Sequence, residues 1–204
     1  MRIQSCAVYK GSTYEIIFEE GGRIYLSSEI VRSKALKDGT ELSRQEVAAL
    51  MYMQQYRKAK ERALYIIEAG DISFRGLYEK LEKNYSQRVC LDVCQKMVSI
   101  GLIDDRKYGA KLAARLFEAK LFGYYRAKQE MKRKGVPDEL IEELCAEYSD
   151  TAQDRLAELI GRKYASKLDD ENGVRKVKAA LARMGYSYSD INEAMKSFGD
   201  DEDE

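Results

Sequence analysis

The chain has 204 residues, 34% of them charged and 45% hydrophobic, and its 35 basic residues balance its 35 acidic ones. A single proline and a high content of Lys, Glu, Ala and Leu favour a mainly helical protein. The chain has no histidine, the commonest general base near neutral pH and the commonest zinc ligand, so catalytic triads that contain histidine are excluded.

The cysteines and the apolar runs indicate the cellular compartment. Cys6, Cys90, Cys94 and Cys145 are too few and too scattered for a secreted disulfide framework, and we expect reduced, mostly buried thiols. They lack the paired C-x-x-C spacing of a zinc site, so no metal or other cofactor is expected. No run of about eighteen apolar residues occurs, and no secretion signal is recognisable. We therefore expect a cytoplasmic protein without a membrane segment.

Residues 1–42 are predicted to form a small β-containing element. Apolar and acidic residues alternate over 14–18, and Gly21-Gly22 can supply the positive φ angles of a hairpin turn before the next apolar run. Residues 2–9 are expected to add a third strand. Residues 28–36 have the pattern of a short helix.

The rest of the chain repeats with a period of fifty residues. Apolar residues recur in five matched sets: Leu77, Ala127 and Val177; Leu81, Met131 and Leu181; Leu91, Ile141 and Ile191; Cys94, Leu144 and Ala194; Val98, Tyr148 and Phe198. Their spacing predicts two amphipathic helices in each unit. Turn signals lie between these helices, and Pro137 fits the first helical position of one of them.

A further helix is predicted ahead of each pair, over 45–69, 105–121 and 151–168. Ser43 and Glu46 have the spacing of a capping box, and Asp104 is a natural N-cap. The expected fold is therefore mainly α, with three tandem three-helix repeats behind the β-containing element. We place the repeats at 43–103, 104–150 and 151–198, followed by an acidic tail at 199–204.

The middle repeat resembles a known family, the RecX regulatory proteins. The resemblance is carried by the turn Gly-Leu-Ile-Asp-Asp at 101–105, the Tyr-Gly-Ala at 108–110, the basic run Gln-Glu-Met-Lys-Arg-Lys-Gly-Val at 129–136, and Glu-Leu-Ile-Glu-Glu at 139–143. Their order and spacing carry the match, which extends over about residues 60 to 198.

The resemblance implies an elongated, curved array of repeats that acts by binding the recombinase RecA. The protein would lie in the helical groove of the RecA filament on single-stranded DNA and suppress ATP hydrolysis and strand exchange in DNA repair and recombination. It implies a regulator and not an enzyme. We further expect a monomer that contacts RecA and could contact single- or double-stranded DNA.

Positive charge gathers in the middle repeat, where residues 105–135 contain ten basic and three acidic residues, a net charge of +7. We expect a basic surface facing the filament or its DNA, with Phe117 in the core and Tyr124 or Tyr125 exposed. The candidate contact residues are Lys111, Arg115, Lys120, Tyr124, Tyr125, Arg126, Lys128, Lys132, Arg133 and Lys134, with Arg175, Lys176 and Lys178 in the third repeat. The alternative is that neighbouring acidic residues pair with these cations within each repeat.

Other functions fit the sequence less well. The doublets Asp104-Asp105 and Asp169-Asp170 could hold magnesium in a nuclease, but each precedes a predicted helix, where carboxylates cap free amide groups. A helical DNA-binding protein that acts without a second protein is the stronger alternative, since three-helix units can present a helix to a DNA groove. A helical scaffold for some other partner also fits the pattern. The acidic tail is either a solubilising end or an internal competitor that covers the basic surface.

Overall fold

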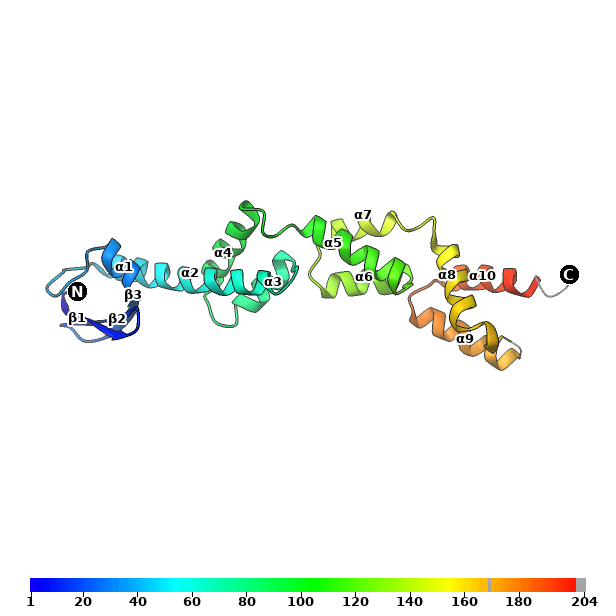
Figure 1. Ribbon diagram of the computed structural model, residues 1–204, viewed down its shortest axis with the longest axis horizontal. Coiled ribbons are helices and arrows are strands. Elements are labelled where there is room, and N and C mark those ends of the chain that lie inside the picture. The colour runs from blue at the N-terminus through cyan, green and yellow to red at the C-terminus, as the bar shows by residue number, and fades with distance from the viewer. Residues whose placement is uncertain (169, 201–204) are drawn as a thin grey trace. The chain divides into compact units, whose positions relative to one another are not determined.

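The computed structural model describes residues 1–168 and 170–200, with side chains as far as Lys196 (Figure 1). It is mainly helical, with a three-stranded sheet at the N-terminus, as predicted. The chain divides into two compact units. One contains Met1–Gly70 and Leu77–Leu102, and the other contains Asp71–Gly76 and the chain from Ile103 onward.

The N-terminal sheet is an antiparallel meander. Strands β1 (Ile3–Lys10), β2 (Thr13–Phe18) and β3 (Arg23–Ser27) lie in the order β1-β2-β3. Gly21 and Gly22 have φ angles of 88° and 92°, which confirms the predicted hairpin turn. The predicted third strand is also confirmed, as β1.

One face of this sheet packs on helix α1 (Ser28–Ser33) and the start of α2 (Arg44–Glu68). The shared core includes Ile16, Phe18 and Leu26 from the sheet. Helix α1 is shorter than the predicted 28–36 because Ala35 adopts a φ of 48°, which a right-handed helix cannot continue.

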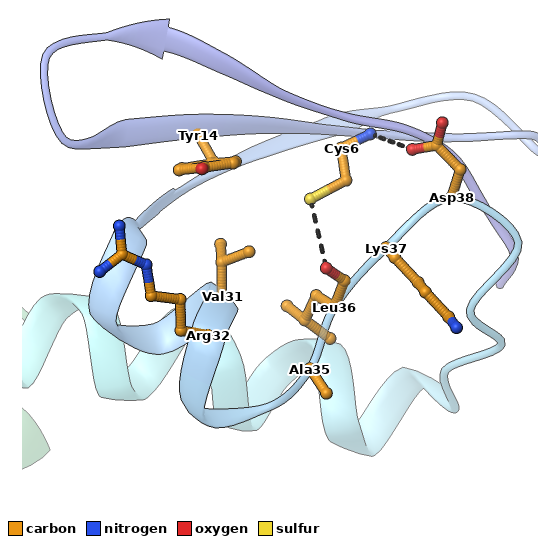
Figure 2. A pocket seen from close by; sticks show the side chains of 8 residues that line it. All are labelled: Cys6, Tyr14, Val31, Arg32, Ala35, Leu36, Lys37 and Asp38. Carbon is orange, nitrogen blue, oxygen red and sulfur yellow. Dashed lines mark hydrogen bonds between the residues drawn. The ribbon is translucent and has the colours of Figure 1, made fainter.

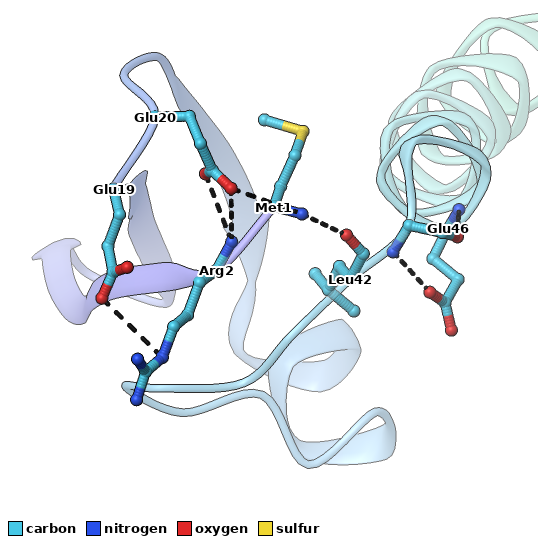
Figure 3. Close-up of polar contacts among 7 residues, drawn as sticks. Met1, Arg2, Glu19, Glu20, Leu42 and Glu46 are labelled. Atoms are coloured by element: carbon cyan, nitrogen blue, oxygen red, sulfur yellow. Dashed lines mark hydrogen bonds and ion pairs between the residues drawn. The ribbon is translucent and has the colours of Figure 1, made fainter.

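The outer edge of β1 is tied to the loop that leads into α2 (Figure 3). The N-terminal amine donates to the carbonyl of Leu42 at 2.7 Å and lies 3.6 Å from the Glu20 carboxylate. The backbone N–H of Arg2 donates to the same carboxylate at 3.2 Å. The predicted capping box of Ser43 and Glu46 then begins α2, so the sheet and the first long helix are joined by satisfied polar groups.

Three helices make each repeat. The first repeat contains α2, α3 (Phe74–Leu81) and α4 (Gln87–Ser99). The second contains α5 (Asp105–Ala114), which continues into the π-helical turn η1 (Arg115–Ala119), then α6 (Tyr124–Arg133) and α7 (Asp138–Ala146). The third contains α8 (Ala152–Lys163), the 3-10 turn η2 (Ala165–Lys167), α9 (Glu171–Arg183) and α10 (Tyr188–Asp200).

The fifty-residue period holds for the second helix of each repeat. All six of its matched residues are buried: Leu77, Ala127, Val177, Leu81, Met131 and Leu181. These positions therefore form the same core layer in each repeat, as predicted.

The period is wrong for the third helix of the first repeat. Leu91 and Val98 were expected in the core, but their exposed fractions are 43% and 45%. Helix α4 begins six residues after Leu81, whereas α7 begins seven residues after the corresponding Met131, and this difference shifts the inward positions of α4 by one residue. Cys90 and Cys94 therefore take the places that Ile141 and Cys145 occupy in the second repeat, and all four are buried.

The other described residues of the three third-helix sets lie in or against the core, as the fifty-residue period predicts. Ile141, Ile191, Cys94, Leu144 and Ala194 are buried as expected, and Tyr148 is half-buried against the core of the second repeat. The side chain of Phe198 lies outside the described residues, as does the acidic tail beyond Asp200.

A polar link between the first and third helices recurs at one position of every repeat. The acceptor is Asp92, Glu143 or Glu193, and the donor is Tyr52, Arg106 or Gln153 respectively. The Arg106 guanidinium donates to Glu143 with two bonds, at 2.7 and 2.6 Å. The repeats thus keep the position of an acceptor carboxylate while the donor changes.

Candidate partner-binding surface

Four of the predicted contact residues have carboxylate partners in their own unit. Lys111 lies 2.6 Å from Asp71, Lys132 lies 3.0 Å from Asp138, Arg133 lies 2.6 Å from Glu130, and Lys128 contacts Glu142. The alternative of pairing within a repeat therefore holds for Lys128, Lys132 and Arg133, whereas Lys111 pairs with Asp71, which precedes the second repeat. Exposed pairs of this kind contribute about 0.2–1 kcal/mol each, so a stronger anionic partner could displace the carboxylates.

Lys128 and Tyr124 share one acceptor across the groove between α6 and α7. The Tyr124 hydroxyl donates to Glu142 at 2.5 Å, and the Lys128 amine donates to the other oxygen of that carboxylate. Hydrogen bonding to Glu142 raises the pKa of both donors, and the same bonds lower the pKa of Glu142. In this second-repeat groove, defined by Tyr124, Lys128 and Glu142, the negative charge of Glu142 therefore offsets the positive charge of Lys128.

A second group leaves positive charge in excess. Arg133 donates to Glu130, and this bond, with the nearby charges of Arg133, Lys120 and Arg126, holds the pKa of Glu130 below its usual range. Lys120 and Arg126 also lie 5.3 and 4.3 Å from the centre of the Phe122 ring. We call Lys120, Arg126, Glu130 and Arg133 the Glu130 cluster; it sets three cations against one carboxylate.

The aromatic residues of the basic segment divide as predicted. Phe117 is buried, while Tyr124 and Tyr125 are exposed at 38% and 58%. Arg115 and Lys134 are exposed, and no ion pair of either side chain occurs among residues 1–168 and 170–200.

The predicted cations of the third repeat contact amides instead of carboxylates. Arg175 donates to the side-chain oxygen of Asn172 at 3.3 Å, and Lys178 donates to that of Asn192 at 2.9 Å. Lys176 is exposed on the same helix. Amide oxygens leave the full positive charge in place, so this helix keeps a charge that α6 largely neutralises.

The backbone joins the second and third repeats at a seam that the sequence pattern did not reveal. The N–H groups of Gly123 and Tyr125 donate to the carbonyls of Met184 and Gly185 at 2.9 and 3.1 Å. A Cβ atom on Gly123 would lie 2.4 Å from the backbone of Gly185, so neither residue can carry a side chain there. The Arg126 guanidinium adds a bond to the carbonyl of Arg183 at 3.1 Å. Gly135 and Gly185 are fifty residues apart, and this recurrence is the sequence signal that could have indicated a close backbone contact here.

Three aspartates of the two doublets accept hydrogen bonds from backbone N–H groups at helix starts. Asp104 accepts from the N–H of Lys107 at 2.9 Å, Asp105 accepts from the N–H of Phe74 at 2.7 Å, and Asp170 accepts from the N–H of Gly173. Asp169 lies outside the described residues. Pro137 is the N-cap of α7, one position earlier than predicted. Within the described chain, His, Cys, Asp and Glu side chains form no group of three that could hold a metal ion.

A separate hollow of about 630 Å³ lies between the sheet and α1, and its lining includes Cys6, Arg32 and Asp38 (Figure 2). The Cys6 thiol donates to the carbonyl of Leu36 at 3.6 Å, and the Cys6 N–H donates to Asp38 at 2.7 Å. Burial, and then the charge of Asp38, raises the pKa of this thiol. The thiol therefore stays protonated and is a weak nucleophile. Cys90, Cys94 and Cys145 are buried and free, as expected.

Tandem three-helix repeats define a helical-repeat protein. None of the described helices is long and apolar enough to span a bilayer. Models of the second and third three-helix domains of RecX match residues 104–144 and 150–195. Over these two repeats the chain is similar to the RecX family of regulatory proteins.

Individual relatives carry the same description. The regulatory protein RecX of Clostridioides difficile is 26% identical over 175 residues, which cover 84% of this chain and 82% of that protein. The regulatory protein RecX of Trichlorobacter lovleyi is 29% identical over 130 residues, covering 61% and 84%. A crystal structure of regulatory protein RecX aligns over 96% of this chain and 98% of its own, with a TM-score of 0.68 and 19% identity, which shows a shared fold.

Proposed function

We propose that this protein regulates the recombinase RecA. It binds in the groove of the RecA filament on single-stranded DNA and suppresses ATP hydrolysis and strand exchange, and it catalyses no reaction itself. Similarity to the RecX family of regulatory proteins supports a regulatory role. The observation that carries the contact surface is the Glu130 cluster, in which three cations surround a single carboxylate.

An excess of exposed cations suits a partner that carries DNA. Charge complementarity speeds encounter with a polyanion and fixes orientation, and its effect falls as salt rises. Lys120 and Arg133 are exposed and can turn toward a partner. Arg126 is also bonded to the seam through Arg183, so it is better left unchanged in a test.

The test measures DNA-dependent ATP hydrolysis by RecA over a range of concentrations of this protein. The double variant Lys120→Glu, Arg133→Glu should need at least about tenfold more protein for half inhibition, because each reversal turns an attraction into a repulsion. The matched control is Lys58→Glu, Lys60→Glu, which reverses two exposed lysines of α2 in the other unit. It should inhibit within about twofold of the unchanged protein.

Two results would contradict these expectations. Equal inhibition by both double variants would show that the Glu130 cluster is not the contact surface. Failure of the unchanged protein to inhibit RecA at any concentration would reject the regulatory function itself. Helical circular dichroism of each variant checks that the fold is retained.

A further inference from the structure

The groove between the second and third helices has the same place in the second and third repeats but opposite chemistry. With the fifty-residue shift, Lys128 of α6 corresponds to Lys178 of α9, and Glu142 of α7 corresponds to Asn192 of α10. Each lysine reaches across to the side chain opposite it, a carboxylate in one repeat and an amide in the other. The same cation is therefore neutralised in the second repeat and left charged in the third.

Two other differences change the third-repeat groove in the same direction. Asp138, an acid at the start of α7, is replaced by Tyr188 at the start of α10. Tyr125 of α6 is replaced by Arg175. Relative to the second repeat, these positions of the third lose two carboxylates and the rings of Tyr124 and Tyr125. They gain a guanidinium at Arg175, the exposed ring of Tyr188 and one carboxylate, at Glu171.

Arg175, Lys178 and Tyr188 line one open hollow on the third repeat, with a volume of about 960 Å³. The lining residues used below are Glu171, Val174, Arg175, Lys178 and Tyr188. Glu171 brings one negative charge, so the hollow keeps two cations against one acid. The exposed fraction of Tyr188 is 71%, which leaves a face of its ring free for stacking. We call this hollow the third-repeat groove.

We infer that the third-repeat groove binds single-stranded DNA. Lys178 and Arg175 can hold backbone phosphates, and Tyr188 offers a ring on which an unpaired base can stack. An acidic protein surface would satisfy the two cations but would not use the exposed ring. A duplex would satisfy the cations too, but its bases are already stacked. The combination of charge and ring therefore favours an unpaired strand.

This inference goes beyond the proposed regulation of RecA because it requires no second protein. Its experiment uses the full chain and a fluorescently labelled oligothymidylate, without RecA, and follows anisotropy at several salt concentrations. Asn192→Glu places a carboxylate opposite Lys178, as Glu142 lies opposite Lys128 in the second repeat, and should neutralise the charge of Lys178. We expect its affinity to fall about tenfold at low salt. The slope of log affinity against log salt should decrease by about 0.7, the value for one lost phosphate contact on a single strand.

Three further variants sharpen this measurement. Asn192→Gln keeps a neutral amide and should bind like the unchanged protein, whereas Glu142→Asn frees Lys128 and should bind more tightly. Tyr188→Leu should bind about tenfold more weakly, as expected for the loss of one stacked base. The control Tyr65→Leu removes a ring that is 64% exposed and lies beside Arg62 on the first repeat, and it should leave affinity unchanged.

Several outcomes would overturn the inference. Unchanged affinity and salt slope for Asn192→Glu would show that the groove does not hold DNA. Loss of RecA inhibition by this variant with unchanged DNA binding would assign the groove to a protein surface. Equal competition by duplex and single strand would exclude stacking on Tyr188. Should Asn192→Glu fail to fold in circular dichroism, Lys178→Gln removes the same charge and decides the question.

Discussion

The first and second repeats share a backbone plan but differ in which chemistry occupies it. Their first and third helices are joined by the Tyr52 hydroxyl and Asp92 in one repeat and by the Arg106 guanidinium and Glu143 in the other. On the outer face of the third helix, Leu91 of the first repeat takes the position of Glu142 in the second. The comparison teaches that the core layer defines the repeat, while its polar links and surface are free to vary.

The largest expected effect tests the one-residue shift between these repeats. Ile141→Asp buries a carboxylate in the core of the second repeat and should destabilise it by more than about 4 kcal/mol. Leu91→Asp, its counterpart in a strict fifty-residue period, should cost less than about 1 kcal/mol because Leu91 faces solvent. Urea unfolding followed by circular dichroism measures both. Similar losses would show that the two positions are equivalent after all.

A smaller effect tests the turn between α6 and α7 of the second repeat. Gly135 has a φ of 79°, and a Cβ atom there would lie 2.7 Å from the Ser73 hydroxyl and 3.0 Å from Cβ of Arg75. Gly135→Ala should therefore cost about 3 kcal/mol, from backbone strain and overpacking together. Gly101→Ala has the strain alone, since its φ is 73° and no atom lies near, and should cost about 1 kcal/mol. Equal losses in thermal unfolding would mean that the close contact with Ser73 is absent.

The smallest effect separates the two helix links by pH. Hydrogen bonding to Asp92 raises the pKa of Tyr52 to about 12, whereas the unfolded value is about 10. The link therefore contributes fully below pH 10 and is lost between pH 10 and 12, a change of about 1 kcal/mol. The bond from Arg106 lowers the pKa of Glu143, so that link contributes above the unfolded pKa and is lost as pH falls through the folded one.

Two conservative variants check this opposition. Tyr52→Phe should flatten the alkaline side of a plot of stability against pH and leave the acid side unchanged. Glu143→Gln should flatten the acid side only. A variant that altered both sides would show that the two links are coupled.

Local sequence signals predicted most of the fold. The capping box at Ser43, the Asp104 cap and the Gly21-Gly22 turn all lie where short-range patterns placed them, because their geometry depends on neighbouring residues alone. Periodicity also identified the core layer of the second helices. It failed at Leu91 because α4 begins one residue sooner after its matched core residue than α7 does, and a shift of one residue rotates a helix face by about 100°.

The candidate surface was harder to predict, since its charges depend on contacts between distant residues. The sequence indicates a basic segment, but not that Lys111 contacts Asp71 or that Lys128 contacts Glu142. It likewise gave no sign that Lys178 contacts an amide. Comparison of equivalent positions in successive repeats could have suggested this difference, once the turn lengths were known.

The glycine seam has a consequence for how binding properties can diverge. Because Gly123 and Gly185 meet through main-chain atoms, the register of the second repeat on the third depends on backbone contacts, to which only the guanidinium of Arg126 adds a bond among the charged residues considered above. Mutation of the exposed charges other than Arg126 can therefore change the surface chemistry of either repeat while the main-chain contacts between the two repeats stay in place.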